Sequence, residues 1–429
     1  MDKMDNSNKI NYMEMSVNPV IEYGIKRRAD IFTVVIFLCL IIIPAVVFWI
    51  IPDQKVSEEE NRSLQQLPAF SVGSLVAGKY TSSMAKYYAD QFPLRNHLIG
   101  AKTLFSYAFG INENKGAVIA KDGWLIQRFD KYSEKSIAEK SAGELGGDLT
   151  FAENMANIKN NSGYINQFYE NIKELYPDIK FTVAVPPRKI DIMTDYLPAH
   201  FPIERHEKYF DELHKYINYD IYASLLGLKA NGKKNLYYKT DHHWTTLGAY
   251  YAYDILGKKM GYTPLTLDHF TVETASENFY GTTWAKAGAK WIKPDRIEYY
   301  RIPDDDEIFI TEIRGPENSK ILKGFYDLEK LETKDKYSSF LGGINSHISI
   351  GRSPFISYQP EKLLLVADSF GLGIAPFLAL HYDIEMIDMR FFNGNVYDLI
   401  KEKKIGSILV LACMENLSTQ NNLIKLTAK

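Results

Sequence analysis

The chain has 429 residues, of which 46% are hydrophobic and 13% aromatic, and its formal net charge is −3. This composition supports a buried core, either in two domains or in one large α/β domain, and excludes a wholly disordered chain. The small negative charge leaves no basic surplus to neutralise phosphates, which argues against nucleic acid as the main partner. With only two cysteines, Cys39 and Cys413, we expect no disulfide framework.

The N-terminal region predicts a short tail followed by a membrane anchor. Residues 1–30 form the tail and carry five basic and five acidic side chains. Residues 31–52 are uncharged and strongly apolar, and at about 1.5 Å per residue a helix of this length spans a hydrocarbon core. Basic residues precede the run and acidic residues follow it, so the positive-inside rule places residues 1–30 in the cytoplasm and residues 53–429 outside. A cleaved signal peptide and a buried core helix are the alternatives.

Residues 53–125 are interpreted as an extracytoplasmic lead-in to the main domain. Gly116 to Ile119 and Lys121 to Leu125 predict a hairpin, with Asp122-Gly123 as its turn. Residues 129–160, rich in Lys, Glu, Ser, Asn and Gly, are expected to form a solvated loop with some helix.

Residues 126–429, the expected main domain, alternate between strand and helix patterns. Helical periodicity covers residues 165–175, 204–218, 372–380 and 394–403. Short apolar runs bounded by turn or charged residues predict buried strands at residues 179–185, 363–366, 384–387 and 408–411. This alternation predicts an α/β fold in which helices cover a parallel sheet, and ligands of such sheets bind at the carboxyl ends of the strands.

Three hydrophilic residues and a tryptophan, Asp241-His242-His243-Trp244, lie in a loop that opens a helical segment near the middle of the chain. Residues two apart in an extended segment point the same way, so Asp241 can orient His243. A carboxylate that holds one ring nitrogen of a histidine fixes its tautomer and stabilises the imidazolium formed when the histidine acts as a base. Two alternatives stay open from these residues alone: helix capping with packed aromatic rings, or a metal site made of Asp241, His242 and His243.

A candidate nucleophile follows the predicted strand at residues 363–366. Ser369 lies in Ala367-Asp368-Ser369-Phe370-Gly371, on the turn between a buried strand and a helix. A serine in this position exposes its hydroxyl group, and its backbone N–H at a helix N-terminus can face an oxyanion. The alternative is that Asp368 or Ser369 only caps the helix.

These motifs resemble the DHHW family, relatives of the alginate O-acetyltransferase proteins within the SGNH hydrolase-like group. Asp241-His242-His243-Trp244 matches the signature that names the family, and Asp368-Ser369-Phe370 and Phe279-Tyr280-Gly281-Thr282 resemble further pieces in the expected order. The resemblance covers most of residues 55–415. It implies an SGNH hydrolase-like domain and a triad in which Ser369 is the nucleophile, His243 the base and Asp241 its orienter.

The remaining site residues are less well defined by the resemblance. The oxyanion glycine and asparagine of other SGNH enzymes have no secure match, and Gly343 and Asn345 are the candidates, although their segment also fits a turn. His242 and Trp244 are further candidates for contact with substrate. Asp241 and His243 precede Ser369 in the chain, as in the alginate-type relatives. No metal and no cofactor are expected.

The sequence thus predicts a single-pass, membrane-anchored extracytoplasmic O-acyltransferase, most simply an O-acetyltransferase, that acts on a cell-surface or exopolysaccharide. A carbohydrate esterase would use the same residues, because only the acceptor differs. A non-catalytic glycan-binding scaffold of a polysaccharide export complex is the alternative from another class. By resemblance to the alginate system, a multi-pass membrane O-acyltransferase is the expected partner that supplies the acyl group.

Overall fold

The computed structural model describes residues 19–57, 59–60, 62–128, 151–201, 204–231, 235–315 and 319–429. The chain forms two compact units: residues 1–57 with 63–97, and residues 58–62 with 98–429. Part of the loop expected at residues 129–160 lies outside the described residues, and its last part, from Phe151 onward, is helical, in agreement with the expectation of some helix.

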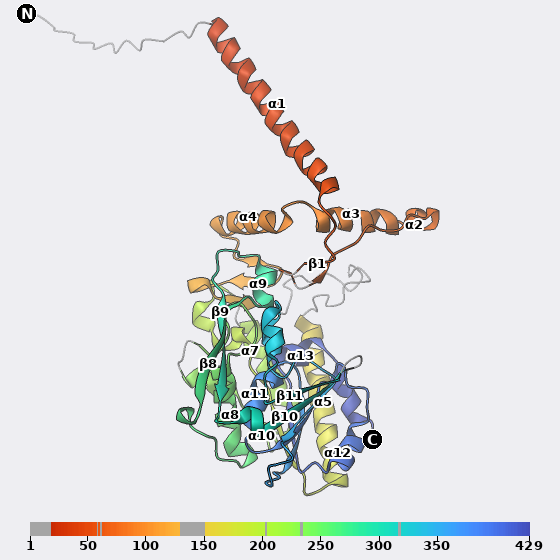
Figure 1. Cartoon of the computed structure of the whole chain (residues 1–429), viewed down its shortest axis with the longest axis vertical. Coiled ribbons are helices and arrows are strands. Elements are labelled where there is room, and N and C mark those ends of the chain that lie inside the picture. The colour runs from red at the N-terminus through yellow and green to blue at the C-terminus, as the bar shows by residue number, and fades with distance from the viewer. Residues whose placement is uncertain are drawn as a thin grey trace, which may run out of the picture. The chain divides into compact units, whose positions relative to one another are not determined.

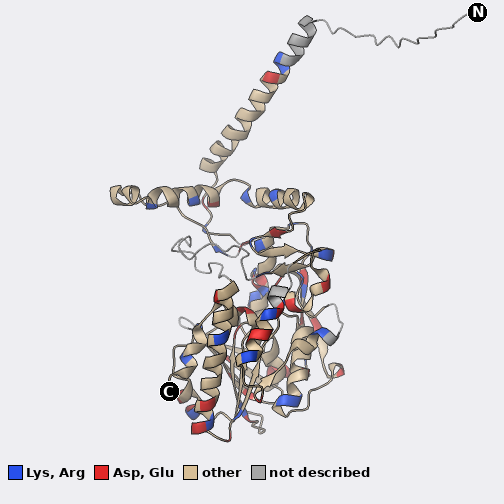
Figure 2. Ribbon diagram, turned by 180° about the vertical axis from the view of Figure 1, so that it is seen from behind, with Lys and Arg blue, Asp and Glu red and all other residues tan. Residues whose placement is uncertain are grey.

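The first unit contains the apolar run. Helix α1 spans Pro19–Ile50, so it begins upstream of the expected anchor and includes its basic flank. Within it, Arg27–Ile50 is long and apolar enough to cross a membrane. No charged residue follows Asp30 in the helix, as Figure 2 shows. Two further helices, α2 (Val72–Val76) and α3 (Lys79–Gln91), complete the helical part of this unit.

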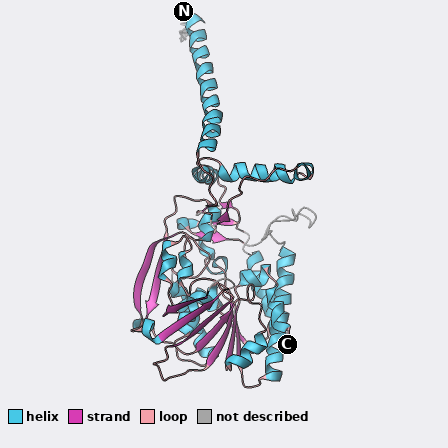
Figure 3. Ribbon diagram, turned by 45° about the vertical axis from the view of Figure 1, so that its right-hand side comes forward, coloured by secondary structure: helices cyan, strands magenta, loops and turns pink. Residues whose placement is uncertain are grey.

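The second unit is built on a large sheet, which Figure 3 shows. Its eight strands have the order β11-β10-β12-β14-β13-β15-β6-β7. Its strands are β6 (Lys180–Ala184), β7 (Tyr222–Ala223), β10 (Phe309–Arg314), β11 (Ser319–Lys323), β12 (His347–Arg352), β13 (Lys362–Ala367), β14 (Asp383–Ile387) and β15 (Ser407–Leu411).

The predicted parallel sheet is confirmed for the half of this sheet that carries β14, β13, β15, β6 and β7, all of which pair in parallel. The other half differs from the prediction. Strands β12, β10 and β11 add to β14 as an antiparallel extension, so the sheet is mixed. An antiparallel edge on a parallel sheet is common in α/β folds.

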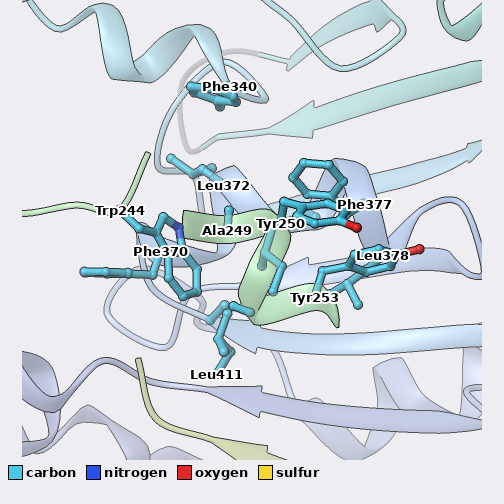
Figure 4. Packing of buried hydrophobic residues seen from close by; sticks show 14 of the residues in the cluster. Trp244, Ala249, Tyr250, Tyr253, Phe340, Phe370, Leu372, Phe377, Leu378 and Leu411 are labelled. Carbon is cyan, nitrogen blue, oxygen red and sulfur yellow. The ribbon is translucent and has the colours of Figure 1, made fainter. Parts of the chain in front are cut away.

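Two hydrophobic cores lie on opposite faces of this sheet. Along β13, Leu363 and Leu365 belong to one core, whereas Leu364 and Val366 belong to the other, because successive side chains of a strand point to opposite faces. The first core is covered by α8 (Thr246–Met260) and α11 (Phe370–Leu378), and Figure 4 shows their packed side chains. The second core is covered by α5 (Phe151–Leu175), α7 (Glu204–Tyr216), α12 (Val396–Lys403) and α13 (Met414–Thr419).

Smaller elements surround this three-layer domain (Figure 1). The predicted hairpin is confirmed: β4 (Ala117–Ile119) pairs with β5 (Leu125–Gln127), and Asp122 and Gly123 both have positive φ in the turn between them. Further elements, which the sequence did not predict, include α4 (Arg95–Ala108), β3 (Glu113–Asn114), α6 (Lys189–Ile192), α9 (Thr282–Ala287), α10 (Asp305–Ile308) and the long hairpin of β8 (Thr271–Phe279) with β9 (Asp295–Arg301).

Candidate active site

Ser369 stands at the carboxyl end of β13, as the sequence predicts, and is the N-cap of α11. The preceding residue, Asp368, fixes this turn. One of its carboxylate oxygens accepts the Phe370 N–H at 3.0 Å, and the other accepts the Cys413 N–H at 2.7 Å and the Asn416 side-chain amide at 2.8 Å. Asp368 therefore connects the turn after β13 to the turn after β15, and the backbone at Ser369 is held from two strands.

The loop that carries Asp241 and His243 is held in place by hydrogen bonds at its base. Tyr237 and Trp244 face each other across an antiparallel bridge that closes the loop. The Asp295 carboxylate, at the start of β9, accepts the Lys239 N–H at 2.7 Å and the Thr240 N–H at 2.6 Å. These contacts hold the backbone N–H groups of Lys239 and Thr240, and they thereby fix the position of the loop up to Asp241.

The structure brings Asp241, His243 and Ser369 together. Nε2 of His243 lies 2.6 Å from Oγ of Ser369, and Nδ1 of His243 lies 2.6 Å from Oδ1 of Asp241. The same Asp241 oxygen accepts the His243 backbone N–H at 3.0 Å. All three side chains are buried. This geometry allows the imidazole to accept the hydroxyl proton of Ser369 while the carboxylate holds the ring in one tautomer.

The second oxygen of Asp241 is held by a residue that sequence reasoning did not single out. Thr282, the first residue of α9, donates its backbone N–H at 2.7 Å and its hydroxyl at 3.0 Å to Oδ2 of Asp241. Gly281 precedes it, and a Cβ atom there would overlap the Asp241 side chain. The only indication in the sequence was the resemblance of residues 279–282 to a family motif, which carried no role for Thr282.

These contacts keep Asp241 ionised. Burial alone would raise the pKa of this carboxyl group, but the adjacent rings of His242 and His243 and the hydrogen bonds from His243 outweigh burial and hold the pKa well below its usual range. An ionised carboxylate at this position stabilises an imidazolium at His243.

Aromatic side chains enclose the His243 ring. Tyr337 stacks on it with the ring centroids 4.1 Å apart, and Phe370 contacts it at 5.1 Å. The Tyr337 hydroxyl donates to the Ser369 carbonyl at 3.2 Å. Stacking restricts rotation of the imidazole, so its two nitrogens stay directed toward Ser369 and Asp241.

His242 differs from its neighbour in exposure and partners. Its side chain is 23% exposed, and its Nδ1 lies 2.9 Å from the Thr282 hydroxyl. Burial and, secondarily, the charge of His243 lower the pKa of His242 to about 3, so this ring is neutral at physiological pH. As a partly exposed neutral ring beside the triad, His242 can contact a bound molecule.

Glu415, at the start of α13, is a further ionisable group of the site that sequence reasoning missed. Burial raises its pKa to about 7, against the opposing charges of Lys286 and His243. This carboxyl group therefore titrates in the physiological range.

Three of the predicted oxyanion or substrate contacts have other partners in the structure. Trp244 is fully buried and packs edge-on against Phe370 in the core (Figure 4), so the prediction that it contacts substrate is corrected to a packing role. Gly343 and Asn345 form a local turn in which the Asn345 amide donates to the Gly343 carbonyl at 3.1 Å. In the described part of the chain, no hydrogen bond connects either of these two residues to Ser369.

The ligand atoms of Asp241, His242 and His243 lie within 4.8 Å of one another, which is close enough to share a metal ion. The same atoms have other partners, however. Both Asp241 oxygens accept hydrogen bonds, His243 Nε2 contacts Ser369, and His242 Nδ1 contacts Thr282. Binding of an ion through these atoms would break the contacts that orient His243, so the arrangement fits proton transfer better than metal ligation.

Two family models match segments of the chain that contain residues of the candidate active site. Residues 118–298 match the model of an SGNH hydrolase-like domain described for the acetyltransferase AlgX, and together with the fold this defines the domain as SGNH hydrolase-like. Residues 213–387 match the model of DHHW proteins. The resemblance to the DHHW family predicted from the sequence is thereby confirmed over this segment.

Curated relatives and solved structures are consistent with these matches. The probable alginate O-acetylases AlgJ of Pseudomonas syringae and Pseudomonas aeruginosa are each 23% identical, over 206 and 212 residues. These alignments cover 46% and 47% of this chain and 46% and 49% of the relatives, so the chain spans about half the length of the curated relatives it matches.

Two solved structures share the fold. A DHHW family protein from Eubacterium siraeum superposes with a TM-score of 0.53 and 20% identity, covering 73% of this chain and 95% of that one. Bacillus cereus PatB1, solved with a sulfonyl adduct, superposes with a TM-score of 0.54 and 19% identity, covering 71% of this chain and 98% of that one.

Proposed function

We propose that this protein is a membrane-anchored O-acyltransferase that transfers an acyl group, most simply acetyl, to a hydroxyl group of an extracytoplasmic polysaccharide. The observation that carries the proposal is the hydrogen-bonded series Ser369–His243–Asp241, with 2.6 Å at each step. The series lies at the carboxyl ends of parallel strands, where α/β domains bind their ligands.

The proposed reaction has two halves. In the first, Oγ of Ser369 attacks the acyl carbonyl carbon and passes its proton to Nε2 of His243. The bond to the donor's leaving group then breaks, and that group takes the proton, which leaves an acyl-serine. In the second half, a sugar hydroxyl attacks the acyl-serine while His243 accepts its proton. Release of the sugar ester returns that proton to Ser369.

The class of acceptor is inferred from the relatives. The curated relatives are named as probable alginate O-acetylases. The segment that matches the domain model of the acetyltransferase AlgX, residues 118–298, contains Asp241 and His243. Water competes with a sugar hydroxyl for the acyl-serine, so a transferase must hold its glycan close to Ser369 and oriented, where effective molarities reach roughly 10⁵ M or more.

The place of the reaction and the acyl donor belong to the same proposal. With residues 31–52 as a retained anchor and the tail cytoplasmic, the catalytic domain would lie outside the cell, away from cytoplasmic acetyl-CoA. The chain carries no nucleotide-binding glycine motif. An acyl group delivered across the membrane, by a multi-pass membrane O-acyltransferase as in the alginate system, would meet this requirement.

Adding an acceptor to the purified full chain in detergent tests the proposal. We expect slow hydrolysis of a small acetyl ester, faster release of the leaving group when an oligosaccharide is added, and acetylated oligosaccharide as product. If native acetylated glycan is deacetylated efficiently and added sugar stays unacetylated, the protein is a carbohydrate esterase. If glycan binds but neither reaction occurs, and Ser369→Ala leaves binding unchanged, the protein is a scaffold.

A further inference from the structure

The helices that follow the apolar span expose an unusual amount of apolar surface. Buried positions in α2, α3 and α4 are few, and many of their large apolar side chains are open to solvent. The exposed apolar residues of this segment are Leu67, Phe70, Val72, Leu75, Val76, Tyr88, Phe92, Leu94, Leu98, Leu104, Phe105, Tyr107, Phe109 and Ile111. Nothing in the proposed reaction uses this surface.

In the first unit, α3 lies against the end of the apolar span. Phe48, in the last turn of α1, contacts Tyr88 of α3 at 5.1 Å and Tyr87 at 5.6 Å between ring centroids. Phe70 contacts Tyr80 of α3 at 5.2 Å. These contacts place α3 and the segment leading into α2 at the level where the span ends, which is the membrane face if α1 crosses a bilayer.

Helix α2 extends the apolar surface of this unit. Val72, Leu75 and Val76 recur at helical spacing and share one side of the helix. They are exposed, and Val76 is 84% accessible to solvent. Within this unit, no described residue buries that side.

In the second unit, the part of α4 from Leu98 onward packs on the domain with one side and exposes apolar residues on the other. Its inner side packs on the domain: Thr103 donates to the Ala287 carbonyl at 3.4 Å, and a Cβ at Gly100 would lie 2.7 Å from the Lys290 side chain. Its outer side presents Leu98 and Phe105, seven residues apart, with 51% and 67% of each exposed. Packing of the inner side already holds the helix on the domain. It does not explain why the outer side exposes apolar residues.

The charge of this segment differs from that of the chain. Residues 64–112 contain four basic side chains and one acidic side chain, Asp90, whereas the whole chain carries a net charge of −3. Asp90 is buried and accepts the Gln65 N–H at 2.9 Å. Exposed apolar side chains interspersed with lysine and arginine are typical of helices that lie in the interfacial layer of an anionic bilayer.

We propose that α2, α3 and the outer side of α4 bind the surface of the membrane that α1 crosses, with their apolar side chains among the lipid acyl chains and their basic side chains at anionic headgroups. The proposal rests on the membrane anchorage but not on the acyl-transfer reaction. Lipid is favoured over a protein partner because α3 contacts the end of the span and the segment has a surplus of basic charge.

Lipid-dependent quenching in the reconstituted full chain tests this proposal. The chain is placed in vesicles of phosphatidylcholine and phosphatidylglycerol that contain a lipid with a nitroxide on its acyl chain. Val76→Cys and Phe105→Cys, each in a Cys39→Ser background, carry an environment-sensitive fluorophore. Cys39 of the natural chain is the positive control in the span. Phe355→Cys, also in the Cys39→Ser background, is the matched control, because Phe355 is 95% exposed and lies between β12 and β13.

We expect nitroxide lipid to quench the probes at positions 76 and 105 several-fold, as it quenches Cys39, and to leave position 355 unchanged. Quenching at 76 and 105 no greater than at 355, with Cys39 quenched, would overturn the proposal. Shielding from water without lipid quenching, together with crosslinks to a second protein chain, would also overturn it and assign the surface to a protein. An unquenched Cys39 would reject the anchorage and the proposal together, whereas hydrolysis of a soluble ester reports separately on the triad.

Discussion

At the level of single residues, both oxygens of Asp241 have partners. Oδ1 accepts from the His243 ring and backbone, and Oδ2 accepts from the backbone and hydroxyl of Thr282. These hydrogen bonds fix the orientation and the charge of the carboxylate. The carboxylate in turn fixes the orientation of the His243 ring. We interpret Thr282 as a positioning residue that acts through Asp241.

Substitutions of Asp241 and of Thr282 should lower turnover by different factors. Asp241→Asn should lower turnover by about 10⁴, because the amide favours the wrong tautomer of His243. Thr282→Val removes one hydrogen bond to a charged group, roughly 1.5–3 kcal/mol, and should lower turnover about tenfold to a hundredfold. Ester hydrolysis across a pH series provides the measurement, and Thr282→Ser is the control that retains the hydroxyl. Equal losses in Thr282→Val and Thr282→Ser would contradict the positioning role.

Glu415 should make stability depend on pH. Its folded-state pKa of about 7 lies above the ordinary 4.5, so the folded chain holds a proton that the unfolded chain releases between these values. Stability from this group is therefore fully present below about pH 4.5 and is lost as the pH rises to 7, by up to roughly 3 kcal/mol. Glu415→Gln should be more stable than the natural chain at pH 8 by a margin that shrinks toward pH 5.

Chemical denaturation of the full chain in detergent at the two pH values measures this margin. Glu402→Gln, on the exposed face of α12, is the matched control and should follow the natural chain at both values. Parallel behaviour of Glu415→Gln and the control would show that folding does not raise the pKa of Glu415.

At the level of elements, the sequence predicted those strands, turns and helices that local residue patterns determine. The buried strands β13, β14 and β15 are continuous apolar runs, and Asp122-Gly123 is a residue pair that favours a tight hairpin turn. Both features could therefore be predicted from the sequence. The strand–turn position of Ser369 followed from them. Residues that are far apart in sequence pair in the β8–β9 hairpin and in the contact of Thr282 with Asp241. A local sequence pattern does not predict such a pairing. Trp244 was misread for the same reason, because its burial depends on Phe370 and α8.

The start of α8 depends on the absence of a side chain at Gly248. A Cβ atom there would overlap the Leu236 carbonyl oxygen and lie 2.9 Å from Cβ of Trp244. Gly248→Ala should therefore separate α8 from the segment that leads into the catalytic loop, cost about 1–3 kcal/mol of stability and reduce turnover. Gly163→Ala is the matched control, since a Cβ atom in this helical position of α5 meets nothing within 4 Å.

Thermal unfolding and ester hydrolysis measure both variants. Gly163→Ala should be neutral or slightly stabilising, because alanine favours the helix over glycine by roughly 1 kcal/mol. A Gly248→Ala protein with natural stability and turnover would show that α8 and the loop are not packed as closely as described.

At the level of the whole molecule, the chain combines one apolar span with an SGNH hydrolase-like domain. The sequence predicted the α/β class and the apolar run because composition and strand–helix alternation are global properties of the chain. It did not predict the antiparallel extension of β12, β10 and β11, since strand direction depends on pairing rather than on residue type.

The basic flank of α1 predicts the topology of the chain. We expect protease added to intact cells to remove the folded domain and leave the tail protected, because Arg27 and Arg28 favour the cytoplasmic side. Immunodetection of both ends of the chain measures the result. A protease-resistant domain in intact cells, or a mature N-terminus near residue 53, would exclude the proposed anchorage.

The most direct test of the proposed chemistry is the mass of the full chain after incubation with 4-nitrophenyl acetate and an acid quench. We expect one acetyl group, located on Ser369 by peptide mapping, absent in Ser369→Ala and formed at least about 10⁴ times more slowly in His243→Ala. An acetyl group on another residue, or Ser369→Ala that turns over the ester as fast as the natural chain, would contradict the assignment of Ser369 as nucleophile.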